Sequence, residues 1–306
     1  MPASCQTIAQ TIADVVARRP VLRPVLQTFA PLLEARAALP ATLAPLLEAG
    51  GFRLPEWNVE RAGQGAPLLA GTSLAGTADA LKAAADVLLP LLAALPGMAG
   101  HVDGLASCLA KDAADAAEAL LAGDASSIAA RAEGAGVPAA VLAFALEAAL
   151  GPVLRAAANM TGVTPWDSHP AAWTQGICPV CGTFPSIAYL EGRTFDEKNA
   201  FLAGGGGKKH LHCALCGTEW HFRRGACPAC GRDDNGVMEL LQEAKGRQGE
   251  RVDWCTACKS YCPTVDLRER DTAPDMDTLA IGMMHLDMVA SGRGLHPLKP
   301  SFWNQF

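Results

Sequence analysis

The chain has 306 residues, about twice the usual length of one domain, so two domains or one large domain are expected. Half of its residues are hydrophobic, 18% are charged and the formal net charge is -6, a balance that is typical of a globular protein and excludes a disordered or polybasic chain. The acidic pI of about 5.6 also argues against binding of nucleic acid or of an anionic membrane surface through overall charge.

Neither a membrane-spanning segment nor an export signal is expected. The longest apolar stretches, residues 87–100 and 137–146, are shorter than the about 18 to 20 residues that a spanning helix needs. Arg18 and Arg19 could belong to a twin-arginine signal, but Pro20 follows and no apolar core comes next, so we interpret the pair as the end of a helix. Eleven cysteines without an export signal favour the cytoplasm, where clustered thiols bind metals or take part in redox chemistry.

Residues 1–164 are predicted to form an all-helical domain. Residues 1–150 contain 67 Ala or Leu and only four aromatic residues, a composition that favours helices packed through small side chains. Apolar residues at helical spacing indicate one helix that ends before Pro20, one that ends before Gly50, and others over 77–95, 105–121 and 137–158. We expect about six to eight helices in this domain.

The composition changes from about residue 165, after a predicted linker over 164–176. Thirteen aromatic residues lie in 151–306, and nine of the eleven cysteines lie between Cys178 and Cys262. We assign 165–270 to two tandem metal-binding β modules, at about 177–220 and 221–268, and 271–306 to a C-terminal helix with a docked tail. The predicted fold class is therefore α+β: an all-α domain, two rubredoxin-like or zinc-ribbon modules, and a final helix with its tail.

Four Cys-x-x-Cys pairs give the strongest functional signal in the chain. They are Cys178 and Cys181, Cys213 and Cys216, Cys227 and Cys230, and Cys255 and Cys258. Two residues between the thiols let one tight turn, called a knuckle, point both sulfurs at the same ion. A glycine follows three of the four pairs and permits the left-handed backbone that a knuckle uses. Two knuckles complete a tetrahedral site with four sulfur ligands, so four knuckles predict two sites.

The spacing between the knuckles predicts how they pair. Thirty-one residues separate the first knuckle from the second and 24 separate the third from the fourth, whereas only ten lie between the second and the third. The two longer intervals can each hold a hairpin, with strands expected at 186–190, 237–241 and 251–254. We therefore assign one metal ion to Cys178, Cys181, Cys213 and Cys216, and another to Cys227, Cys230, Cys255 and Cys258. An interleaved pairing is the alternative, and Cys262 is interpreted as a spare buried thiol.

The ligand set predicts two metal ions without fixing the element. Four thiolates suit zinc and a single rubredoxin-like iron equally. Catalytic thioredoxin-like pairs are disfavoured, because the surrounding sequence shows no βαβ pattern. Eight thiolates add -8 and two divalent ions return +4, so the formal charge of -6 becomes about -10. We interpret the cations at 208–210 and 223–224 as compensation for these anionic sites and not as a track for phosphates.

The last segment is predicted to form one helix and a packed tail. Asp275 can cap a helix that extends to about residue 290 and carries four methionines. We expect the methionines to pack in the core, with a client-binding surface as the alternative. The tail contains Phe302, Trp303 and Phe306 and is too apolar to remain free.

Several strings in the second half resemble the formate dehydrogenase accessory protein FdhE family. They are Leu211-His212-Cys213-Ala214-Leu215-Cys216-Gly217-Thr218-Glu219-Trp220-His221, Cys227-Pro-Ala-Cys230-Gly, Asp277-Thr-Leu-Ala and Gly294-Leu-His-Pro297. The resemblance covers about residues 170–297, and the first half fits only in composition and length. The glycine run at 204–207 is longer than the family usually carries, which leaves the conformation of that hairpin open. The resemblance implies a non-catalytic, cytoplasmic maturation factor with iron in rubredoxin-like sites, which binds the catalytic subunit of a respiratory formate dehydrogenase before its twin-arginine export.

Other classes of function fit the cysteines less well. A rubredoxin-like electron carrier needs a redox-active iron and a partner reductase, and a zinc-ribbon nucleic-acid-binding protein is disfavoured by the acidic pI. The Cys-x-x-Cys-x-Gly-x-Gly repeat of zinc chaperones of the DnaJ type is absent. No enzyme is expected, because no Ser-His-Asp grouping, phosphate loop or carboxylate pair stands out and sites with four sulfur ligands are closed to substrate. The oligomeric state and the client-binding surface stay open.

Overall fold

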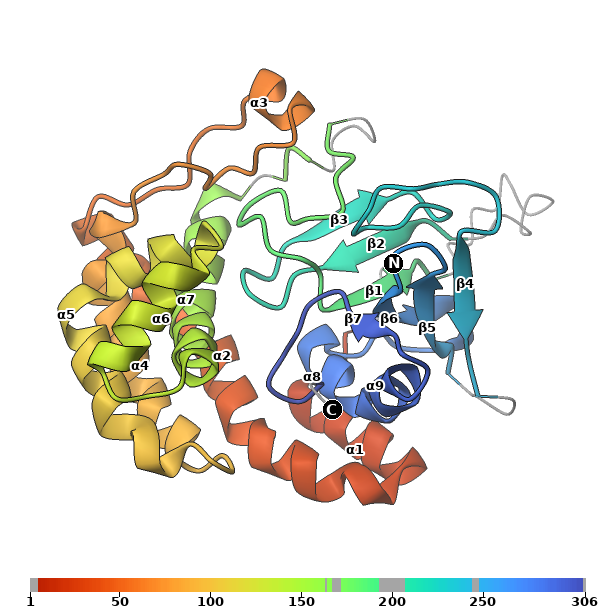
Figure 1. Ribbon diagram of the computed structural model, residues 1–306, viewed down its shortest axis with the longest axis horizontal. Coiled ribbons are helices and arrows are strands. Elements are labelled where there is room, and N and C mark those ends of the chain that lie inside the picture. Colours follow the sequence, from red (N-terminus) through yellow and green to blue (C-terminus); the bar gives the residue numbers. More distant parts are fainter. Residues whose placement is uncertain (1–4, 163, 167–171, 193–206, 244–247, 305–306) are drawn as a thin grey trace.

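The helical half and the strand-rich half of the chain lie side by side (Figure 1). The computed structural model describes residues 5–162, 164–166, 172–192, 207–243 and 248–304. The α-helices of the first half are α1 (Ile8–Arg18), α2 (Arg23–Ala49), α3 (Val59–Gly63), α4 (Ala78–Ala93), α5 (Val102–Leu121), α6 (Ala125–Gly134) and α7 (Ala139–Thr161). Short 3-10 turns lie at Pro20–Leu22, Ala75–Thr77, Ala99–His101 and Leu267–Glu269. The described residues thus confirm an all-helical first half with a number of helices in the predicted range.

Helix α2 is longer than the sequence indicated. It runs through Pro31, Pro40 and Pro45, whereas only its last turns were predicted. A proline inside a helix removes one backbone hydrogen bond and normally kinks or ends the helix. Burial of Leu26 and Leu47, each fully shielded from solvent, and packing against α4 and α7 outweigh that cost.

Helix α7 is the one helix in the described part of the chain that is long and apolar enough to cross a membrane. Glu147 and Arg155 lie within the helix, so its sequence contains no uninterrupted apolar stretch of spanning length and no spanning segment was expected here. Its most apolar window is 61% buried, and the helix packs against α2, α4, α5 and α6. A core helix of a globular protein meets the same criteria of length and composition, and this position accounts for its apolar character.

The strands form one mixed sheet. They are β1 (Ile187–Leu190), β2 (Lys209–His212), β3 (Glu219–Phe222), β4 (Met238–Leu241), β5 (Glu250–Cys255), β6 (Ser260–Asp266) and β7 (His296–Pro297). Their order is β3-β2-β1-β6-β5-β4, with β7 paired to β6 outside this path. The three predicted strand segments therefore correspond to β1, β4 and β5.

The two metal modules are joined through a parallel strand pair. Strands β1, β2 and β3 are antiparallel neighbours, as are β4, β5 and β6. Between these groups β1 runs parallel to β6, with Ala188 opposite Thr264 and Leu190 opposite Asp266. The modules are tandem in sequence, as predicted, but their strands share one hydrogen-bonded sheet.

Strand β5 meets the end of α1 and the segment before α8 through a buried carboxylate. Glu250 on β5 accepts from Arg18 at 2.7 Å, from Arg19 at 2.6 Å and from Arg270 at 2.6 Å. The Glu250 side chain is 2% exposed. Helix α1 ends at Arg18, as predicted, and the arginine pair that closes it holds α1 against the sheet.

The predicted C-terminal helix is divided in two. Asp275 caps α8 (Met276–Gly282) by accepting from the Thr278 backbone N–H at 2.8 Å, and α9 (Met284–Ser291) follows. Gly282 lies so close to Val15 of α1 that an added Cβ would approach it to 2.9 Å. This close approach requires a glycine, and glycine is a poor helix former, so the break falls here. Of the four methionines, Met276 and Met283 are buried, Met284 is half-buried and Met288 is exposed.

The C-terminal tail docks on the helical half, as predicted. The Phe302 ring stacks on Phe144 with centroids 4.8 Å apart, and Trp303 meets Phe29 edge-on at 5.9 Å. Lys299 forms an ion pair with Glu147 of α7. Residue 306 lies outside the described residues.

The described part of the predicted linker is packed. Trp166 and Trp173 are 5% and 2% exposed, and their rings lie 5.9 and 6.2 Å from that of Trp57. Residues 167–171 of the linker lie outside the described residues. One continuous hydrophobic core therefore includes residues of both halves.

Replacing Glu250 by Gln is expected to lower the free energy of unfolding by about 3 to 5 kcal/mol, because it leaves buried guanidinium groups without their counter-charge. The measurement is urea denaturation followed by circular dichroism. Asp86→Asn is the matched control, since the Lys82–Asp86 pair is exposed and its loss should cost at most about 1 kcal/mol. Equal unfolding midpoints for the two variants would contradict a structural role of Glu250.

Candidate metal centres

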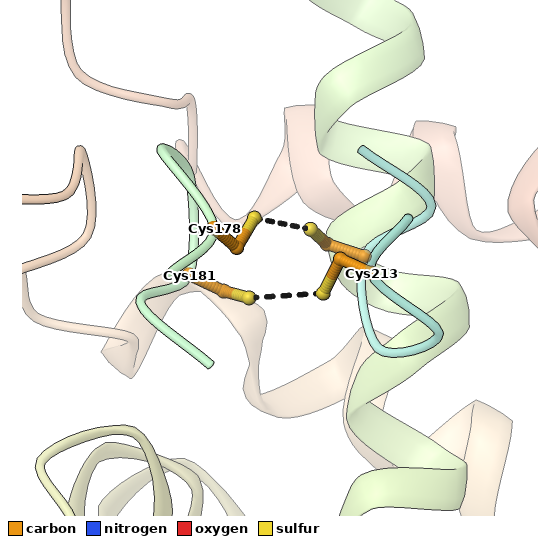
Figure 2. Close-up of side chains that lie close together, drawn as sticks. Cys178, Cys181 and Cys213 are labelled. Carbon is orange, nitrogen blue, oxygen red and sulfur yellow. Dashed lines mark hydrogen bonds between the residues drawn. The ribbon is translucent and has the colours of Figure 1, made fainter. Parts of the chain in front are cut away.

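The first group of thiols is fully enclosed. Cys178 and Cys181 lie in the loop before β1, and Cys213 and Cys216 lie in the turn between β2 and β3. The four sulfurs lie within 4.8 Å of one another, with Cys178 3.4 Å from Cys216 and Cys181 3.5 Å from Cys213. Figure 2 shows the two knuckles facing each other beside a helix. Each cysteine is at most 3% exposed.

The second group is built in the same way but is more open. Cys227 and Cys230 follow β3, Cys255 is the last residue of β5, and Cys258 lies in the turn between β5 and β6. Cys227 lies 3.6 Å from Cys258, and Cys230 lies 3.8 Å from Cys255. Cys227 and Cys255 are buried, Cys258 is half-buried and Cys230 is exposed. The eight cysteines thus come together in the two predicted sets of four, and the interleaved pairing is not observed.

All four knuckles have the same backbone turn. The residue after the second cysteine has a positive φ in each case, and its N–H donates to the carbonyl of the first cysteine. These residues are Gly182, Gly217, Gly231 and Lys259, with φ between 62° and 76° and hydrogen bonds of 2.8 to 3.0 Å. Glycine adopts this conformation without strain, as predicted for three knuckles, whereas Lys259 adopts it in the fourth as a non-glycine residue.

The donor set fits a tetrahedral divalent ion. Burial raises the pKa of the Cys178 and Cys181 thiols well above their ordinary value. For Cys213 burial acts in the same direction, but hydrogen bonds from the neighbouring thiols and Thr183 prevail and lower its pKa. A bound ion would supply the positive charge that stabilises four thiolates in this dry environment. The two groups can therefore hold two metal ions, and four sulfur ligands fit zinc and iron alike.

Hydroxyl groups surround the sulfurs. Thr183 Oγ1 lies 3.1 Å from Cys181 Sγ and 3.2 Å from Cys213 Sγ, and Thr218 Oγ1 lies 3.1 Å from Cys216 Sγ. In the second group Ser260 Oγ lies 3.0 Å from Cys258 Sγ. Such hydroxyls can donate to thiolates and orient them around an ion.

Two arginines hold the first centre against the helices. Arg36 of α2 and Arg155 of α7 both donate to the carbonyl of Ala214, between the cysteines of the second knuckle, at 3.0 and 2.8 Å. Arg155 also donates to Asp277 of α8 at 2.5 Å. Neither arginine was predicted as part of the site. The only available signal was the rarity of cations in an Ala- and Leu-rich helix.

Two of the segments that resemble the FdhE family, those that contain His212 and Asp277, lie next to each other beside these arginines. His212 Nε2 lies 2.9 Å from Asp277 Oδ1, and its Nδ1 lies 3.2 Å from Glu219 Oε1. Although burial opposes protonation, the two carboxylates raise the pKa of His212 to about 10, so the imidazole is charged at neutral pH. The Arg155 and His212 cations outweigh burial and hold the pKa of Asp277 below its ordinary value. Three cations and two carboxylates therefore surround the first centre, an excess of one positive charge next to an anionic metal site.

Three of the five basic residues at 208–210 and 223–224 contact carboxylates. Lys209 is buried and pairs with Asp253 at 2.7 Å, and His210 lies 2.8 Å from Glu191. Arg223 pairs with Asp233. These contacts argue against a track for phosphates. Residues 204–206 of the glycine run lie outside the described residues.

Cys262 is buried and lies outside both groups of four. Its Sγ is 3.5 Å from the Pro263 carbonyl, and burial raises its pKa to about 12. It is therefore a neutral thiol, in agreement with its interpretation as a spare cysteine.

Elemental analysis is expected to find two metal ions per chain, because each group offers four sulfur ligands and no more. Cys213→Ser should remove one ion and leave the other. Loss of both ions in this variant, with the helical circular dichroism signal intact, would contradict two independent centres.

Thr183→Val is expected to weaken metal binding at the first centre by about tenfold, because it removes a hydroxyl that contacts two sulfurs and keeps the shape of the side chain. Competition with a chromophoric chelator measures the affinity. Ser260→Ala is the matched variant and should weaken only the second centre. Unchanged affinity in both variants would show that the hydroxyls do not contribute.

Comparison with known proteins finds relatives in sequence and in fold. No family model matches the chain. It is 31% identical over 130 residues to a protein named FdhE homolog from Shewanella baltica (strain OS185), a match that covers 41% of this chain and 38% of that protein. An FdhE homolog from Aquifex aeolicus is 28% identical over 131 residues, a match that covers 42% of this chain and 42% of that protein. An FdhE homolog from Haemophilus influenzae (strain PittEE) is 29% identical over 125 residues, a match that covers 40% of this chain and 37% of that protein. The matches thus span well under half of these relatives.

The fold extends the similarity over nearly the whole chain. The crystal structure of the FdhE protein from Pseudomonas aeruginosa superimposes with a TM-score of 0.60 and 20% identity, and the match covers 97% of this chain and 93% of that one. The resemblance to the FdhE family that the sequence indicated is therefore confirmed, in sequence over about 130 residues and in fold over almost the entire chain.

Proposed function

We propose that this protein is a non-catalytic accessory factor, which binds the catalytic subunit of a respiratory formate dehydrogenase in the cytoplasm and assists its assembly before export. The observation that carries the proposal is the pair of four-cysteine groups whose strands share one sheet, in a chain with the fold of an FdhE protein. The similarity to proteins named FdhE homolog supports the same role.

The chemistry of the two groups supports a binding role over catalysis. A catalytic zinc or iron site keeps one coordination position for water or substrate, whereas four cysteines fill a tetrahedral ion. The reduced state of eight clustered thiols suits a cytoplasmic location. We propose the eight cysteines as metal ligands, and the division at 1–164, 165–270 and 271–306 as the functional one: helical platform, metal modules, and C-terminal helices with their tail.

The metal modules are well placed to shape a client-binding surface. Both knuckles of the first centre contact the helical half, the second through Arg36 and Arg155 and the first through backbone bonds from Leu68 to Pro179 and from Leu69 to Val180 at 2.8 and 3.0 Å. An ion at the first centre would therefore fix the angle between the helices and the sheet. A client that contacts both halves would depend on this angle.

An electron carrier is the second candidate. It is favoured by Cys230, whose exposure would bring one sulfur ligand of an iron at the second centre to the surface. Electron transfer requires such access and an ion that changes its charge, and zinc cannot do so.

Cys178→Ser is expected to weaken binding of the formate dehydrogenase catalytic subunit by about tenfold or more, because an incomplete first centre no longer fixes the knuckles against the helices. A pull-down with purified subunit measures the binding. Lys82→Gln, at an exposed position on α4, is the matched control and should bind normally. Undiminished binding by the Cys178 variant would refute the role proposed for this centre.

Extracts that lack the accessory factor distinguish the two candidates. If the protein is an assembly factor with structural metals, its zinc-loaded and iron-loaded forms should restore formate dehydrogenase activity equally. Rescue by the iron form alone would favour the electron carrier. Formate oxidation by the purified protein without the dehydrogenase would overturn the non-catalytic assignment.

A further inference from the structure

The two thiol groups have the same chemistry but very different surroundings. The first group belongs to the main hydrophobic core, in which Cys178, Cys181, Cys213 and Cys216 are all buried. The second group packs in a separate small cluster of Cys227, Cys255 and Val237, with Met238 and Cys258 at its edge. Little apolar packing therefore opposes local opening of the second group, whereas opening of the first disturbs the main core.

Among the described contacts, the first group also accepts more hydrogen bonds from distant parts of the chain than the second group does. Four carbonyls in the knuckles of the first group accept from outside the module: Pro179 and Val180 from backbone N–H groups, and Ala214 and Leu215 from arginines. For the second group the comparable bond from a distant segment runs from His296 N–H to the Lys259 carbonyl at 3.1 Å. The third knuckle, which carries the exposed Cys230, has backbone bonds only within itself among the described contacts.

An open cavity leads to the second group. It has a volume of about 930 Å³, and Cys227 and Cys230 form part of its wall. Lys208, Arg223 and Arg224 also line it, and both arginines are exposed. Arg224 donates to the Gly207 carbonyl and Arg223 pairs with Asp233, so among the described contacts one carboxylate faces these three cations. The wall of the cavity therefore carries an excess of positive charge, although the net charge of the whole protein is -6.

We infer that the second group is a metal-exchange centre, which releases its ion to an anionic oxygen or sulfur ligand that enters this cavity, while the first group retains its ion as a permanent structural element. Cys230 is the first ligand to leave, because its sulfur faces solvent. Donor atoms of the incoming ligand would bond to the ion in turn, as its bonds to Cys230 Sγ and then to the other three sulfurs break. The ion would keep its charge, each freed thiolate would take up a proton from the buffer, and the cations of the cavity would favour the approach of an anion.

The inference rests on metal binding by both groups and is independent of the client. Protein loaded with two zinc ions is mixed with excess EDTA, and zinc release is followed over time. One equivalent is expected to leave about tenfold or more faster than the other, because only one centre can open locally. Release of both ions at one rate would overturn the inference, and fewer than two ions at the start would instead contradict the two-metal assignment.

Alkylation assigns the fast phase in the unmodified protein. Among the eight ligand cysteines, brief treatment with iodoacetamide during release, followed by peptide mapping, should label Cys230 and Cys258 first, whereas the exposed Cys5 should react independently of release. The four cysteines of the first centre should react only in denaturant. Labelling of Cys178 or Cys213 before Cys230 would reverse the assignment of the two centres.

The charge of the cavity is tested with two chelators. The double variant Lys208→Gln, Arg224→Gln should release its fast zinc several times more slowly to anionic EDTA and at an unchanged rate to neutral 1,10-phenanthroline. Lys82→Gln is the control for a lost cation elsewhere. Equal slowing with both chelators, or none with EDTA, would show that these cations do not select an anionic ligand.

Discussion

The guanidinium of Arg155 is the contact on which the arrangement of the three segments depends. It extends from α7 and donates both to Ala214, inside a metal knuckle, and to Asp277, at the start of α8. Helical half, first centre and C-terminal helices therefore meet at one side chain. The planar guanidinium has donors on three nitrogens, and its Nε also reaches the Leu215 carbonyl at 3.5 Å, which the single nitrogen of a lysine is less suited to do. Asp277 in turn faces the charged His212, so the cluster is nearly neutral and can be buried beside the main core.

The opposite end of the interface uses the same principle with the charges reversed. There a single carboxylate, Glu250, accepts from Arg18, Arg19 and Arg270 and joins α1, β5 and the segment before α8. Hydrophobic burial alone would hold the helices against the sheet but would leave their relative positions loosely specified. Directional charged hydrogen bonds at both ends select one position, at the cost of dehydrating the ions.

The sequence predicted the local features well, because local features depend on neighbouring residues. Cysteine spacing and the following glycines identified the knuckles, and hairpin-sized intervals identified their partners. The continuation of α2 through Pro31 and Pro40, the parallel pairing of β1 with β6 and the contacts of Arg36 were not predictable in this way. Each depends on residues that are far apart in the chain, and the proline penalty in α2 is outweighed only by burial that the finished fold provides.

The positions of the two centres determine what a change at each can do. The first lies where helices, sheet and α8 meet, so an altered ligand there would disturb Ala214 and the contacts of Arg155 and hence the whole interface. The second lies at the β5–β6 turn, with a small packing cluster of its own. Rearrangement around Cys230 can stay local, because its knuckle has few bonds to the rest of the fold. The two four-cysteine groups therefore differ in what they are suited to: the first is placed to fix the interface between helices and sheet, and the second is placed to change locally without disturbing it.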